Sequence, residues 1–260
     1  MSRILLIVIL LLLSACSAPA SDSTPAELTV AAASSMQNAF SEIGALFEAQ
    51  TGQKIIFVFA SSGQLTQQIE NGAPYDLFAA ANTEFIDRLD KQNLVLTDTI
   101  ARYARGRIAL AVNKDSGIQA VNLDDLLLSE ITHIAIANPE HAPYGVAARE
   151  ALQSAGVWEQ VRPKLVYGEN IRQTLQFIQT GDAQAGIIAL SDANVPEVTW
   201  NLLDNRLHNP LDQALAVVAS SPNQQTARQF AEFINSPESL AILKKYGFSS
   251  PGNVADSTSP

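Results

Sequence analysis

Two alanine–serine tracts constrain the fold of this chain more than any other feature. Each tract, residues 31–35 (AAASS) and residues 60–63 (ASSG), follows an apolar, β-branched run. After each tract, apolar residues recur at helical spacing up to a glycine, Gly52 or Gly72. The pattern predicts two consecutive strand–turn–helix units that carry hydroxyl groups at the turn.

This placement is typical of a ligand site. In α/β proteins, ligands bind at the carboxyl ends of the strands, and a helix N-terminus offers unpaired N–H groups and a partial positive charge that suit an anion. A simpler interpretation is that Ser34 and Ser62 only cap their helices. The occurrence of such a serine turn in two successive strand–helix units favours the anion site.

Strand-like and helical patterns alternate along the rest of the chain, which indicates an α/β architecture. Apolar runs predict further strands over 76–81, 108–112, 134–137, 165–167, 186–189 and 214–219. Asn170 is expected to cap a helix that ends at Gly181. Prolines at 222 and 237 are expected at the first position of two final helices.

The first residues predict export. Arg3 precedes ten apolar residues, 4–13, which are too few to span a bilayer and suit the core of a signal peptide. The sequence Leu-Ser-Ala-Cys at 13–16 resembles a bacterial lipobox, and Cys16 is the only cysteine in the chain. We expect a signal peptide over 1–15, lipidation of Cys16, a tether over 16–26 and a flexible tail over 249–260.

Composition excludes several functions. The formal net charge is −10 and no Lys/Arg cluster is present, which argues against nucleic acid as a partner. An anion would therefore have to be held by local donors. The three histidines lack the spacing of a metal site, and neither a Gly-x-Ser-x-Gly elbow nor a glycine-rich phosphate loop occurs. We expect no enzyme activity and no cofactor.

Further motifs complete a specific order along the chain: FASSGQL at 59–65, GAPYDLF at 72–78, NPEHAPYG at 138–145, GENIR at 168–172 and KYGF at 245–248. Together with the first tract, they resemble the family of periplasmic molybdate-binding proteins, the solute receptors of ABC importers. The resemblance implies a type II periplasmic-binding-protein clamshell, in which each of two lobes is a mixed sheet flanked by helices. Lobe 1 would comprise 27–107 and 212–248, and lobe 2 would comprise 108–211.

The resemblance also implies the ligand contacts. Ser34, Ser35 and Ser62 match donors at the two serine turns, and Ile171 matches a residue that donates its backbone N–H. In one branch of the family a tyrosine stands where this chain has Ala189. Tyr144 matches the tyrosine of another branch, and we expect its hydroxyl to take that role. The alternative is that Tyr144 only packs in the cleft wall.

The implied function is the binding of molybdate, and also tungstate, by a monomeric, membrane-anchored periplasmic lipoprotein that delivers the oxyanion to a membrane permease. Hydrogen bonds from the five residues, without direct coordination, would hold the ligand. Two alternatives remain: a clamshell receptor for iron or an organic anion, and an enzyme on the same fold. The sequence does not separate molybdate from tungstate, and it does not identify the anchoring membrane.

Overall fold

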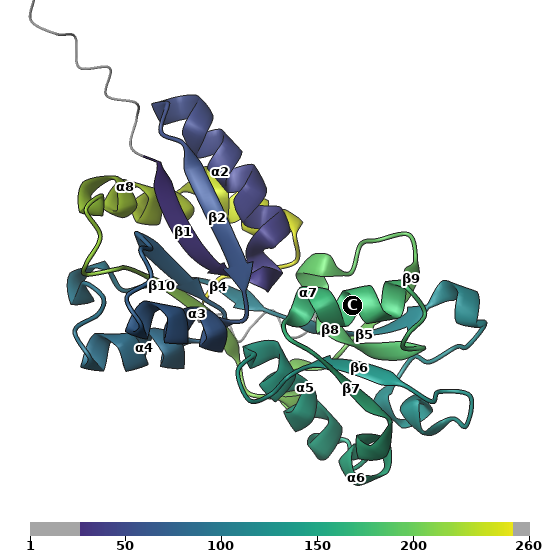
Figure 1. Ribbon diagram of the computed structural model, residues 1–260. Coiled ribbons are helices and arrows are strands. Elements are labelled where there is room, and N and C mark those ends of the chain that lie inside the picture. The colour runs from purple at the N-terminus through teal and green to yellow at the C-terminus, as the bar shows by residue number, and fades with distance from the viewer. Residues whose placement is uncertain (1–26, 252–260) are drawn as a thin grey trace, which may run out of the picture.

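Two five-stranded sheets, one in each of two lobes, organise the protein (Figure 1). The computed structural model describes residues 27–251. The strand order is β2-β1-β3-β10-β4 in the first sheet and β7-β6-β8-β5-β9 in the second. Three neighbouring strands in each sheet are parallel, and the other two join by antiparallel pairing. The predicted fold class, two lobes that are each a mixed sheet flanked by helices, is confirmed.

The strands are β1 (Leu28–Ala33), β2 (Ile55–Ala60), β3 (Leu77–Ala80), β4 (Ala101–Gly106), β5 (Ile108–Asn113), β6 (Ile134–Ala137), β7 (Leu165–Gly168), β8 (Ala185–Ala189), β9 (Val198–Leu202) and β10 (Leu211–Val217). The α-helices are α2 (Gln37–Thr51), α3 (Ser62–Glu70), α4 (Thr83–Lys91), α5 (Pro143–Ser154), α6 (Trp158–Val161), α7 (Ile171–Gln179), α8 (Gln224–Ile234) and α9 (Pro237–Lys245). Short 3-10 helices are η1 (Ser34–Met36), η2 (Thr97–Thr99), η3 (Lys114–Ser116), η4 (Leu123–Leu127), η5 (Arg162–Lys164), η6 (Leu190–Asp192) and η7 (Asn205–Leu207).

Helices cover both faces of each sheet. On β1, Val30 packs with α2, α8 and α9, whereas the adjacent Ala31 packs with α3 and α4 on the other face. In the second sheet, α5 lies on one face and α7 on the other. Strands buried on both faces are continuous apolar runs, which is why the sequence reveals them clearly.

The sheet edges depart from the expected pattern. The strands β4 and β9 were not predicted, because each is an edge strand and carries exposed polar side chains in place of an apolar run. The helix expected to begin at Pro222 begins instead at Gln224, whereas α9 does begin at Pro237. The hydroxyl of Ser221 donates to Asp76 and accepts from the N–H of Asn223, which holds this segment in a turn.

The chain crosses between the lobes twice. The first crossing joins β4 to β5 through Arg107, and the second joins β9 to β10. The final strand, β10, therefore returns to the first sheet and places Gln213 at the boundary between the lobes. At the end of the described chain, Ser249 exchanges two backbone hydrogen bonds with Arg105 of β4.

The predicted signal peptide, Cys16 with its tether, and tail residues 252–260 lie outside the described residues. Within residues 27–251, no helix has the length and apolarity needed to cross a membrane.

The close contact between β6 and β8 yields a prediction about stability. A Cβ added to Gly186 would lie 2.3 Å from the carbonyl oxygen of Ala135, a backbone atom that cannot move aside. We expect Gly186→Ala to lower the free energy of unfolding by about 1–3 kcal/mol or more. Urea denaturation measures this loss. The control is Ala111→Gly, a substitution of the residue that pairs with Gly186, and its expected loss of unfolding free energy is about 1 kcal/mol. A smaller loss in Gly186→Ala than in the control would contradict the argument.

Candidate functional site

A small cavity lies between the lobes, where the carboxyl ends of strands from both sheets meet. It contains about 200 Å³ of space that no protein atom fills, part of which is open to solvent. None of its lining residues carries a charge. They are Ala33, Ser34, Ser35, Ala60, Ser61, Ser62, Ala81, Ala142, Pro143, Tyr144 and Ile171. The structure thus brings together all five residues for which the sequence predicts a ligand contact.

The strand register of the first sheet explains why the two serine turns meet. β1 and β2 are parallel, with Ala33 beside Ala60, so the residues that follow each strand emerge side by side. Ser34 and Ser35 begin the 3-10 turn that leads into α2, and Ala33 provides no side chain that could cap this turn. The hydroxyl of Ser35 is buried and has no hydrogen-bond partner. Such a group normally has a partner in a folded protein, so an incoming acceptor would satisfy it.

The second turn leaves Ser62 available. Ser61, which the sequence did not single out as a site residue, caps α3 and forms a capping box with Gln64. The hydroxyl of Ser62 accepts the N–H of Ala81 at 2.9 Å, so its own proton can be donated into the cavity. The interpretation of Ser34 and Ser62 as helix caps is therefore wrong, since neither side chain caps a helix.

The second lobe contributes two donors. Asn170 caps α7 as predicted, accepting the N–H groups of Arg172 and Gln173. The cap does not engage the first amide of the helix, that of Ile171, a residue that lines the cavity. Tyr144 lies at the start of α5 with only 3% of its surface exposed. Its hydroxyl accepts a hydrogen bond of 3.1 Å from Gln213 Nε2.

The electrostatics of the cavity favour an anion without a counter-charge. The helices that begin at the cavity are η1 with α2, α3, α5 and α7, and each presents the positive end of its dipole. Burial raises the pKa of the Tyr144 phenol well above its usual range, so the hydroxyl keeps its proton. The nearby Ser35 hydroxyl and the Gln213 amide oppose this shift.

Direct hydrogen bonds hold the lobes together around the cavity. The N–H of Gly63 in the first lobe donates to the carbonyl of His141 in the second, and His141 Nδ1 lies 2.9 Å from the Ser61 hydroxyl. The hydroxyl of Ser191 donates to the carbonyl of Ser35. The sequence analysis included His141 in a family motif and rejected it as a metal ligand, but it did not predict this contact between the lobes.

A buried carboxylate forms part of the same contact. Asp192 is 1% exposed, and its Oδ1 accepts from Arg172 at 2.9 Å and from Asn38 of the first lobe at 3.2 Å. Its Oδ2 has no partner. Burial raises the pKa of Asp192 from 3.8 to about 7, and Arg172 opposes this shift.

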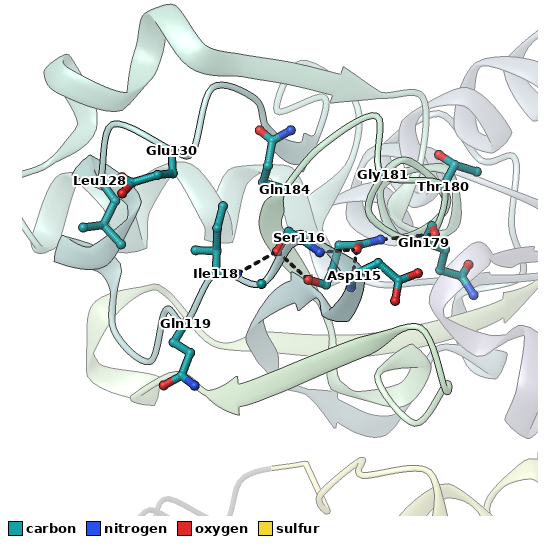
Figure 2. A pocket seen from close by; sticks show the side chains of 12 residues that line it. Asp115, Ser116, Ile118, Gln119, Leu128, Glu130, Gln179, Thr180, Gly181 and Gln184 are labelled. Carbon is teal, nitrogen blue, oxygen red and sulfur yellow. Dashed lines mark hydrogen bonds between the residues drawn. The ribbon is translucent and has the colours of Figure 1, made fainter.

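A larger hollow at the far side of the second lobe has no comparable donor set (Figure 2). It contains about 1420 Å³ of space that no atom fills, much of it open to solvent. The polar groups of Asn113 and Ser116 there already bond to the surrounding backbone. Among the described residues, no group of three or more His, Cys, Asp or Glu side chains could hold a metal ion.

Three comparisons place the chain among known proteins. A family model described as bacterial extracellular solute-binding protein matches residues 28–249. The molybdate-binding protein ModA of Rhodobacter capsulatus is 32% identical over 227 residues, 85% of this chain and 88% of that protein. The ModA of Escherichia coli is 33% identical over 232 residues, with the same two coverages. The solved structure of the Azotobacter vinelandii periplasmic molybdate-binding protein superposes with a TM-score of 0.80 at 28% identity, covering 86% of this chain and 99% of that one.

The titration of Asp192 yields a prediction about pH. The unfolded chain releases this proton near pH 4 and the folded chain near pH 7, so the contribution of Asp192 to stability falls as pH rises between these values. We expect Asp192→Asn to gain stability relative to the natural chain across this window, by about 1.4 kcal/mol for each unit of pKa difference.

Chemical denaturation of the ligand-free protein at pH 4.5, 6 and 7.5 measures this gain. Asp182→Asn, the same substitution at an exposed position, is the matched control. A stability difference between Asp192→Asn and the natural chain that stays constant with pH would show that Asp192 does not titrate in this window.

Proposed function

The chain belongs to the bacterial extracellular solute-binding protein family, and we propose that it binds molybdate between its lobes and delivers it to a membrane permease of an ABC importer. The relatives in R. capsulatus and E. coli and the superposed A. vinelandii structure all carry molybdate binding in their names. Membership of an extracellular family places the protein outside the cytoplasmic membrane, in agreement with the predicted export. The family is one of solute-binding proteins, not of enzymes.

The observation that carries this proposal is a cavity between the lobes that no charged residue lines and that several neutral hydrogen-bond donors border. An oxyanion that leaves water loses its hydration and needs donors in return. Hydroxyls of Ser34, Ser35, Ser62 and Tyr144, together with uncapped backbone N–H groups such as that of Ile171, can supply them. Hydrogen bonds to an ionised acceptor are stronger than neutral ones, so a full shell of such donors can replace a cation.

Selectivity would follow from the size of the cavity. Its donors sit on helix N-termini and strand ends, which are held by the cores of the two lobes. A smaller tetrahedral anion such as sulfate cannot reach donors on both sides at good distance, and the unmade hydrogen bonds would disfavour it. Tungstate has the same shape and nearly the same size as molybdate, so we propose that it binds as well.

Closure of the lobes would be the signal to the permease. The serine donors belong to the first lobe, whereas Tyr144 and Ile171 belong to the second, so one ligand bonds to both lobes. A ligand shifts such an equilibrium by its additional contacts in the closed state. The hydrogen bonds that Gly63 and Ser191 form between the lobes would add to the stability of the closed state.

The cavity does not favour the two alternative receptors. Iron receptors of this type hold the metal with paired tyrosines and carboxylates, whereas this cavity is lined by one tyrosine, Tyr144, and by no carboxylate. An organic carboxylate is typically held by a bidentate arginine, which is also absent from the lining.

Calorimetry on the purified full chain, dialysed free of anions, tests the proposal. We expect one-to-one binding of molybdate and tungstate and no heat from sulfate or phosphate. Sulfate binding of equal strength would overturn the selectivity argument, and an absence of heat from both molybdate and tungstate would overturn the function.

The same assay tests Tyr144. Removing the phenol oxygen in Tyr144→Phe should cost one hydrogen bond to a charged acceptor, about 1.5–3 kcal/mol or roughly a 10- to 150-fold loss of molybdate affinity. Tyr167→Phe, at an exposed tyrosine of the second lobe, is the matched control and should bind normally. Equal affinities in the two variants would mean that Tyr144 only packs in the cleft wall.

We also propose that Cys16 carries the lipid that anchors the protein, as its place in the lipobox-like sequence suggests. In cells, Cys16→Ala should abolish labelling by a radioactive fatty acid and move the protein from the membrane fraction to a soluble fraction. Ser17→Ala is the neighbouring control. Retention of the label in Cys16→Ala would exclude this anchor.

A further inference from the structure

We propose that Gln213 is a positioning residue for the bound oxyanion: it orients the Tyr144 hydroxyl so that its proton points into the cavity. This inference rests on the proposed function and adds a residue that does not line the cavity. Gln213 is completely buried in β10, the strand that returns to the first lobe, whereas Tyr144 belongs to the second lobe. Their hydrogen bond therefore joins the two lobes behind the ligand.

The hydrogen bonds around Gln213 form a directed chain. Tyr103 of β4, itself 1% exposed, donates its hydroxyl proton to Gln213 Oε1 at 3.2 Å. The alternative acceptor for that proton, the carbonyl of Ala80, is farther away at 3.5 Å. With Oε1 engaged by Tyr103, the amide presents Nε2 to Tyr144 and donates to it at 3.1 Å.

This direction decides what Tyr144 can offer a ligand. A tyrosine hydroxyl has one proton and accepts through its lone pairs. Because Tyr144 accepts from Gln213, its own proton remains available on the cavity side. The reverse arrangement, with Tyr144 donating to the amide oxygen, would turn a lone pair toward the anion and repel it.

The backbone fixes this geometry at two points. The pairing of β10 with β4 shifts register between Gln213 and Ala214, and such a bulge re-aims the side chains beside it. At Gly106 of β4, an added Cβ would lie 2.2 Å from the Tyr144 hydroxyl and 2.9 Å from Gln213 Nε2. Only glycine leaves room for the two polar groups to meet at this crossing between the lobes.

Gln213→Glu tests the direction of the chain. A carboxylate accepts from both tyrosines, so it would draw the Tyr144 proton away from the cavity and add a negative charge. We expect molybdate affinity at pH 8 to fall about 100-fold or more relative to the natural chain. As pH is lowered to 5.5, the buried carboxyl takes up a proton, donates to Tyr144 as the amide does, and most of the affinity returns.

The comparison is the ratio of variant to natural affinity at each pH, which cancels the titration of groups that both proteins share. Gln184→Glu is the matched control, because Gln184 lies at the far hollow of the second lobe (Figure 2) and should keep a ratio near one. An effect of the added charge alone would persist when the same ratio is measured in a Tyr144→Phe background, whereas an effect through the Tyr144 hydroxyl would shrink there.

A double-mutant cycle shows whether Gln213 acts through Tyr144. Gln213→Leu should weaken molybdate binding about 10-fold in the natural chain and less than about threefold in a Tyr144→Phe background. Calorimetry on the full chain in detergent measures all four proteins, and a thermal melt of each establishes that it is folded. If Gln213→Leu does not fold, Gln213→Glu measured at pH 8 with and without Tyr144→Phe completes the same cycle.

The outcomes separate the two proposals. Absence of molybdate binding by the natural chain overturns the proposed function, and the inference with it. Normal binding by the natural chain, combined with full affinity of Gln213→Glu at pH 8 or with additive effects of Gln213→Leu and Tyr144→Phe, overturns the positioning role alone.

Discussion

The proposed function depends on one physical exchange: an oxyanion in the cavity between the lobes gives up water for neutral hydrogen-bond donors. The protein is acidic, with a formal net charge of −10, so its long-range field does not attract an anion. The cavity offsets this unfavourable long-range field locally, because helix N-termini from both lobes converge on it and no carboxylate lines it. Small residues at the strand ends, such as Ala33 and Ala60, allow the backbone amides to approach the same point.

In the proposed mechanism, this arrangement couples ligand binding to closure of the lobes. Three of the five proposed donor residues belong to the first lobe and two to the second, so the proposed shell is complete only when the lobes meet. The same closed state forms the hydrogen bonds from Gly63 to His141 and from Gln213 to Tyr144. Asp192 contacts Asn38 across the boundary without a partner for its Oδ2, so one polar group is left incompletely satisfied in this state. Such a group weakens closure and leaves the ligand to supply part of the stabilisation.

Some residues of the site can be predicted from local sequence patterns, and others cannot. Ser34, Ser35 and Ser62 follow predictable strands, and Asn170 precedes a predictable helix, so their meeting at one edge follows from α/β topology. Gln213 and His141 carry no comparable signal, because each acts on a partner distant in the chain. Gln213 lies 69 residues from Tyr144, and His141 lies 80 residues from Ser61. The edge strands β4 and β9 were also not predicted, because they carry exposed polar side chains and therefore lack the apolar run of a core strand.

The sequence by itself determined the α/β class and the placement of hydroxyl and amide donors at helix starts, because periodicity and capping are local properties of the chain, and the family resemblance implied the two-lobed fold. The tertiary structure alone decided which serine caps α3, which groups join the lobes, and which way the Tyr144 hydroxyl is held. Those choices depend on strand register, on the space left by Gly106 and on burial, and each arises only when distant segments pack together.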